Sequence, residues 1–195
     1  NVDEAVLTAL MNTFNTKVHD VAIVSRAVEQ QRELRRLGDA TLTRISQDIV
    51  DAVNRDGSFK TVECVKEALR AHIADEAKRE DTAIKIVTEI TIASFDTELR
   101  RIGITNRDRI TAISEDFVAH MSRGLNNMAQ LREALRTVLK VGITDDVALT
   151  RIANEIIAKI NARTFSLREI VGVIRPHLAG IGITKPDTVT ALSIN

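Results

Sequence analysis

The sequence lacks several of the features on which common binding and catalytic sites depend. A single cysteine, Cys64, can form neither an internal disulfide nor a CxxC zinc site. There are five Phe but no Tyr or Trp, so the usual stacking platforms for single-stranded nucleic acid are missing. Lys and Arg together number 27, as do Asp and Glu, and this zero net charge disfavours nucleic-acid binding by bulk electrostatics. No GxGxxG, GxxxxGK[ST] or HExxH motif occurs, so a nucleotide loop or a zinc enzyme has no sequence support.

Long apolar runs are also missing. The richest stretch, residues 83–95, is interrupted by Lys85 and Glu89 and falls short of the roughly 18 residues of a membrane span. The chain starts with Asn1 and shows no basic and apolar leader, so we expect no signal peptide and a processed or partial polypeptide. These features predict no membrane association, and a location in the cytoplasm or in a particle assembled inside the cell.

An internal repeat is the strongest positive signal. One tetrapeptide pattern recurs three times, with its glycines 39 and 40 residues apart: Ile102-Gly103-Ile104-Thr105, Val141-Gly142-Ile143-Thr144 and Ile181-Gly182-Ile183-Thr184. A glycine after an apolar helix end can take the left-handed conformation that closes the helix, and a following Thr can cap the next one. We therefore predict a positive φ at Gly103, Gly142 and Gly182, each before a Thr-capped helix.

Each of these glycine-containing tetrapeptides, which we call a corner, is followed by two amphipathic segments with helical spacing. In the first segment the apolar positions of two copies are Ile110, Ile113, Phe117 and Met121, and Leu149, Ile152, Ile156 and Ile160. The second segment starts at an aligned position, Thr61, Asn127 or Ser166, and its apolar residues are Leu131, Leu135, Val138 and Leu139, or Ile170, Ile174 and Leu178. The pattern predicts an all-α fold of tandem helical hairpins of about 40 residues, arranged as an α-solenoid or a compact bundle.

The chain divides into three predicted regions. Residues 1–38 contain no Gly or Pro before Gly38 and predict a long N-terminal helix, or two short ones if Asn12 to Thr16 weaken its middle. Residues 39–101 predict a first hairpin whose second helix is extended by residues 78–101. The alternating isoleucines there would also suit a strand, but we favour a helix because no partner strand is found. Residues 102–195 predict two regular hairpins and a C-terminal half-repeat.

Charged residues recur at fixed places in the repeat. Arg70, Arg136 and Arg175 occupy one position of the second helix, and Asp48, Asp116 and Glu155 occupy one position of the first. We predict a structural role for these charges: either ion pairs between the two helices, with Arg136 bonded to Asp116, or arginines that favour the C-terminal end of the second helix. The alternative is a ladder of arginines that faces an acidic ligand.

The sequence offers no catalytic, cofactor-binding or metal-binding residue. Cys64 aligns with Gln130 and Glu169, which predicts a surface thiol, and no histidine lies near it in sequence. His72 and His177 share a repeat position that holds Val138 in another copy, so we expect them at helix edges. No cofactor is predicted.

We therefore expect a non-enzymatic structural or assembly protein that uses repeated helical faces and its termini to contact other proteins or copies of itself, as in a filament, a shell or a virion-type particle. The near-heptad stripe of Leu7, Leu10, Met11, Phe14, Val18 and Val21, and the half-repeat at 181–195, are the expected contact regions. The alternative is a helical adaptor that binds nucleic acid through the clusters Arg32-Arg35-Arg36 and Arg100-Arg101.

Overall fold

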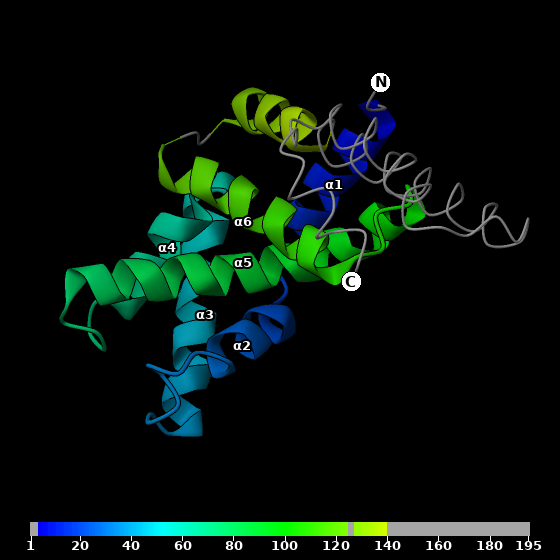
Figure 1. The fold of residues 1–195 in the computed structure, drawn as a ribbon. Helices are drawn as coiled ribbons and strands as arrows, with labels where there is room; N and C mark the ends of the chain where they lie inside the picture. The colour runs from blue at the N-terminus through cyan, green and yellow to red at the C-terminus, as the bar shows by residue number, and fades with distance from the viewer. Residues whose placement is uncertain (1–3, 125–126, 140–195) are drawn as a thin grey trace, which may run out of the picture. The chain divides into compact units, whose positions relative to one another are not determined.

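The computed structural model describes residues 4–124 and 127–139, which belong to one compact unit of residues 1–140. Every regular element in these residues is a helix, which confirms the predicted all-α class. The elements are α1 (Glu4–Lys17), α2 (Val21–Glu29), α3 (Asp39–Asp56), the 3₁₀ turn η1 (Ser58–Lys60), α4 (Thr61–Leu69), α5 (Glu76–Arg101), α6 (Arg107–Ser122) and a helix over residues 128–139 (Figure 1). The predicted hairpin at 141–179 and the half-repeat at 181–195 lie outside the described residues.

The N-terminal region forms two short helices, the alternative to the single long helix predicted over residues 1–38. The single long helix is therefore wrong. The break falls at residues 18–20, beyond the stretch from Asn12 to Thr16, where the sequence suggested it. Asp20 has extended backbone, and its carboxylate accepts a hydrogen bond from the N–H of Ala22 at 2.9 Å. This N-cap starts α2. α2 ends at Glu29, and turns rather than a helix lead to Gly38.

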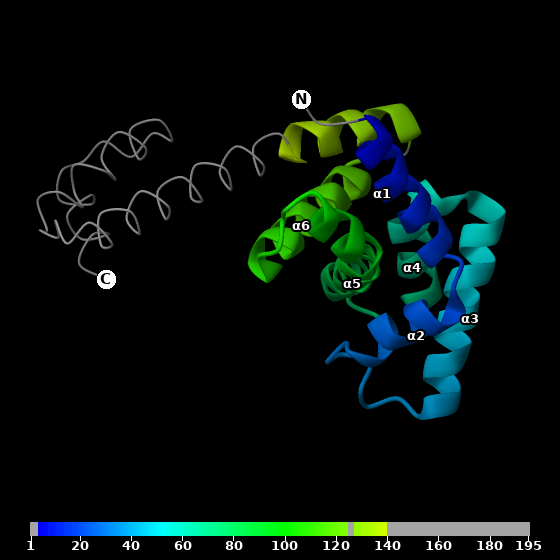
Figure 2. The ribbon, with the colours of Figure 1, turned by 90° about the vertical axis from the view of Figure 1, so that its right-hand side faces the viewer.

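α5 is the central element of the fold. α1, α2, α4 and α6 all pack against it, and Figure 2 views it nearly along its axis with these helices around it. Its helical conformation confirms the helix predicted over residues 78–101. It does not extend α4, however, because α4 ends at Leu69 and Asp75 caps a new helix by accepting from the N–H of Lys78 at 3.0 Å. The extended second helix predicted for the first hairpin is therefore wrong.

Three phenylalanine rings join the N-terminal and C-terminal parts of this unit. Phe117 of α6 makes edge-on contacts with Phe14 of α1 and Phe95 of α5, with centroid distances of 5.2 Å in both pairs. All three side chains are buried. Such contacts add about 0.5–1.5 kcal/mol each to the gain from burial. The core thus links residues that are about a hundred positions apart in sequence.

The apolar stripe of α1 belongs to this core. Leu7, Leu10, Met11, Phe14 and Val18 are at most 1% exposed, and only Val21, at the start of α2, is exposed. Residues 4–18 therefore do not present the free apolar face that we predicted for a partner. The stripe has the spacing of a paired helix because it pairs with α5 within the same chain.

The corner between α5 and α6 has the predicted conformation at its glycine. Gly103 has a φ of 94°, and the N–H of Ile104 donates to the carbonyl of Leu99 at 2.9 Å, while the N–H of Gly103 donates to that of Arg100 at 3.0 Å. These bonds are those of a Schellman motif. The predicted Thr cap is wrong, because Asn106 and not Thr105 accepts from the N–H of Asp108. Gly142 and Gly182 lie outside the described residues.

Candidate functional site

Two of the repeated arginines, Arg70 and Arg136, lie in the described residues, and each forms an ion pair with the glutamate three residues earlier. Arg175 and Glu155 lie outside the described residues. Arg70 bonds to Glu67 at 3.0 Å, and Arg136 bonds to Glu133, in each case one turn earlier on the same helix. Oδ2 of Asp116 lies 3.2 Å from Nδ1 of His120 on the same helix. The predicted pair between Arg136 and Asp116 is therefore wrong, because the acidic partners of Arg136 are Glu133 and Glu4.

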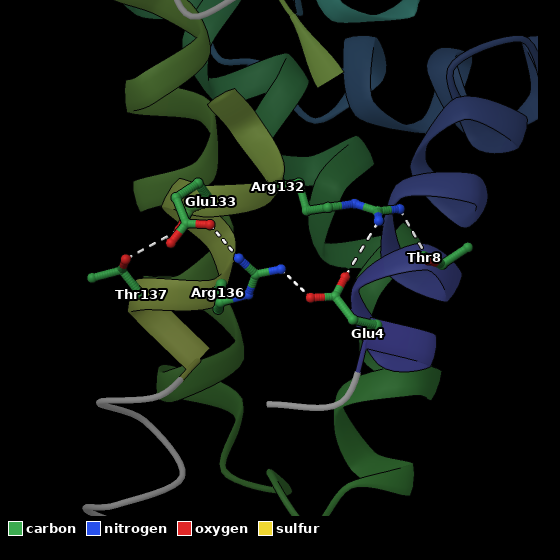
Figure 3. Close-up of polar contacts among 6 residues, drawn as sticks. All are labelled: Glu4, Thr8, Arg132, Glu133, Arg136 and Thr137. Atoms are coloured by element: carbon green, nitrogen blue, oxygen red, sulfur yellow. Dashed lines mark hydrogen bonds and ion pairs between the residues drawn. The ribbon is translucent and has the colours of Figure 1, made fainter. Parts of the chain in front are cut away.

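Arg136 also takes part in a second cluster that joins the N-terminal helix to the helix over residues 128–139 (Figure 3). Glu4 accepts from both Arg136 and Arg132, with a distance of 3.4 Å to Arg132 Nη1. Arg132 Nη2 donates to the hydroxyl of Thr8 at 2.9 Å. The Glu4 side chain is 61% exposed, so solvent screens these ion pairs and they mainly fix the orientation of the two helices.

A third polar cluster surrounds His19, in the link between α1 and α2. Its Nδ1–H donates to Oδ1 of Asn54 at the end of α3, at 2.5 Å, and its Nε2 lies 3.1 Å from Oγ of Ser58 in η1. The Ser58 hydroxyl also bonds to Oδ1 of Asn15 on α1. Sequence analysis missed this cluster because its members are 35 to 43 residues apart and form no motif.

The order hydroxyl, imidazole and amide in this cluster is also that of nucleophile, base and orienting group in hydrolases. Two features favour a clamp between α1, α3 and η1 over catalysis. Ser58 is 5% exposed, and its hydroxyl lies between two acceptors, Nε2 of His19 and Oδ1 of Asn15. The hollows described below are lined by none of these residues.

Cys64 is buried on α4, with 3% of its surface exposed, so the predicted surface thiol is wrong. Burial, and to a lesser extent the charge of Asp56, raises the pKa of this thiol to about 11. At neutral pH the thiol is protonated and a weak nucleophile. The prediction failed because α4 packs against α3, α5 and α6, so that more than one of its faces is covered.

A hollow of about 530 Å³ lies between α3 and α4. Small side chains, including Ala52 and Ala68, line it together with charged ones such as Arg44 and Asp48. His72 also lines it and is half-buried, but it lies in the turn that follows α4 and not at the predicted helix edge. Acidic and basic side chains are mixed in this hollow, as they are on an ordinary solvent-exposed protein surface.

The two arginine clusters differ in their surroundings. Arg100 bonds to Asp96 at 2.9 Å, and Arg101 bonds to Glu98 at the same distance, so acidic neighbours on α5 neutralise both. Arg32, Arg35 and Arg36 are exposed in the turns that follow α2. A nucleic-acid contact would therefore depend on the turn over residues 30–36.

Within residues 4–124 and 127–139, no group of three His, Cys, Asp or Glu side chains could hold a metal ion. No helix in the same residues is long and apolar enough to cross a membrane. Comparison with known protein families, with characterised proteins and with solved structures gave no match. Inferences about function therefore rest on the residues of this chain.

Proposed function

We propose that this chain is a non-enzymatic structural or assembly protein that contacts other proteins, above all copies of itself, through the faces of repeated helical hairpins. The observation that carries the proposal is the equivalence of two sequence copies. The segment of α3 and α4 and the segment of α6 and residues 128–139 correspond in sequence, and they share buried positions and local bonds.

Two details make this equivalence specific. Ser46 and Ser114, at matching positions, are buried and donate to the carbonyls four residues earlier at 2.9 and 2.8 Å. The segment Glu-Ala-Leu-Arg occurs at 67–70 and at 133–136, with its Leu buried and its Arg bonded to its Glu in both. These shared details support the proposal that one hairpin type is repeated, and the sequence signature recurs after Val141.

Repetition of one hairpin suits assembly because each unit buries an apolar face only against a neighbour. Residues 181–195 carry Ile183, Val189, Leu192 and Ile194 at the apolar positions of a further copy of the repeat. Since α5 covers the apolar stripe of α1, we propose that these residues, and not the N-terminal helix, contribute to the contacts between chains.

The groups nearest to a catalytic set also fit this proposal. Cys64 is a buried, protonated thiol, and the Ser58 hydroxyl lies between two acceptors. Both have the surroundings of packing groups rather than of reactive ones.

A helical adaptor for nucleic acid is the alternative, and the exposed turn with Arg32, Arg35 and Arg36 favours it. Light scattering of the full chain with and without a single-stranded oligonucleotide separates the two functions. We expect an oligomer whose mass is unchanged by the oligonucleotide. A mass increase that disappears at high salt, and that is lost when the three arginines are replaced by Ser, would favour the adaptor.

Deletion of residues 181–195 tests the C-terminal contribution. We expect the deletion to lower the assembly state or to expose apolar surface to a hydrophobic dye. A deleted chain of unchanged mass, stability and dye binding would contradict the docking role of this segment.

A further inference from the structure

A trough runs along α5, between α6 and the residues that follow α2. Figure 1 shows α5 with α6 on one side and α2 on the other. The main part of the trough has a volume of about 500 Å³ and is lined by residues of all three segments, among them Gln31, Ile84 and Glu115. A second hollow of about 370 Å³ shares Gln31 and Asp81 with it and reaches Lys78. The lining of this second hollow is polar and of mixed charge, with Arg32, Lys78 and Lys85 beside Glu33 and Asp81. From Lys78 to Ile92 the two hollows follow about 21 Å of the axis of α5. This is the length of a helix of about four turns.

The floor of the trough carries two isoleucines and a threonine at helical spacing. Ile84, Thr88 and Ile92 lie four residues apart on one side of α5 and all line the trough. Ile84 and Ile92 are only half-buried, whereas Ile86 and Ile90 are fully buried in the core. The alternation of isoleucines in the sequence thus divides α5 into a core face and a second face, on which Ile84 and Ile92 remain partly exposed on either side of the buried Thr88.

The charges on the rim of the main part are predominantly acidic. Lys85 is bonded to Asp81 at 2.6 Å, which neutralises one acidic group. Glu89 of α5 and Glu115 of α6 form no ion pair with any cation in residues 4–124 and 127–139. Two uncompensated carboxylates therefore lie beside Ile84 and Ile92, on two different helices.

We infer that this trough binds an amphipathic helix of a partner protein, one that places Lys or Arg beside an apolar stripe. An apolar stripe in a groove takes side chains at i, i+4 and i+8 of such a helix, and the rim carboxylates select for basic neighbours. The inference rests on the proposed function, because it names one of the surfaces by which the chain contacts other proteins.

The test uses a fluorescently labelled synthetic helix of about 16 residues, with Leu at i, i+4, i+8 and i+11 and Lys beside these positions. Its control peptide has Glu in place of every Lys. The full chain is compared with the double variant Glu89→Lys/Glu115→Lys. The matched variant Asp48→Lys/Asp51→Lys changes the net charge equally on the exposed face of α3.

Fluorescence anisotropy should show binding of the Lys peptide to the full chain and to the α3 variant, and binding about ten-fold weaker to the trough variant. The Glu peptide should prefer the trough variant. Failure of the Lys peptide to bind, or equal binding by both variants, would overturn the inference. Loss of self-association in the trough variant, without any peptide binding, would overturn it in favour of a second copy as occupant.

The proposed function is tested separately by the mass of the full chain. A chain that assembles but does not bind the peptide would refute only the trough inference.

Discussion

Replacement of Gly103 by Ala tests the corner between α5 and α6 in isolation from side-chain packing. Gly103 has a φ of 94°, and a methyl group built on it would meet no atom within 4 Å. The whole cost of the change is therefore the strain of placing an L-residue in the left-handed region, about 1–2 kcal/mol of unfolding free energy. For a chain of this length, that corresponds to a fall of about 2–8 °C in the midpoint of thermal unfolding.

Gly38→Ala is the matched control. Gly38 has equally open surroundings but a φ of −70°, which any residue adopts, so its replacement should change stability by no more than about 0.5 kcal/mol. Since the chain has no Trp or Tyr, unfolding in urea is best followed by circular dichroism. Equal effects of the two substitutions, or a stable Gly103→Ala variant, would refute the assignment of left-handed strain to this corner.

Three further predictions concern the core and the polar clusters. Phe117→Ala should lower the unfolding free energy by about 3–5 kcal/mol in urea melts, because it removes the ring that contacts both Phe14 and Phe95; a loss below 1 kcal/mol would contradict the described core. Because the Cys64 pKa is about 11 in the fold and about 8.5 in an unfolded chain, the unfolded thiol loses its proton first. The unfolding free energy should therefore fall as pH rises from about 8.5 towards 11, and less so in Cys64→Ala; parallel pH profiles would contradict this. Glu4→Gln should lower the unfolding free energy by less than about 1 kcal/mol, since the ion pairs of Glu4 are solvent-exposed. A larger loss would contradict the description of these pairs as exposed and screened.

Local features of this fold could be predicted from sequence, because they depend on neighbours along the chain. The left-handed Gly103 follows from an apolar helix end and a glycine. The helical conformation of α5 follows from its length and the absence of a partner strand. The buried positions Ile110, Ile113, Phe117 and Met121 follow from their spacing.

Features that depend on which helices meet could not be predicted in this way. Cys64 was expected at the surface because the repeat aligns it with polar residues, but α4 has neighbours on several faces. Arg136 was expected to bond to Asp116, yet Glu133 on its own helix and Glu4 near the N-terminus are its partners. The polar cluster of His19 joins three segments that only the fold brings together.

The mass of the full chain in solution tests the central proposal most directly. Light scattering during size-exclusion chromatography, over a range of concentrations and at physiological salt, compares the particle with the 21.5 kDa of a single chain. Self-association through helical faces predicts a discrete multiple of this mass that decreases when residues 181–195 are removed. A mass of 21.5 kDa at every concentration would contradict self-association.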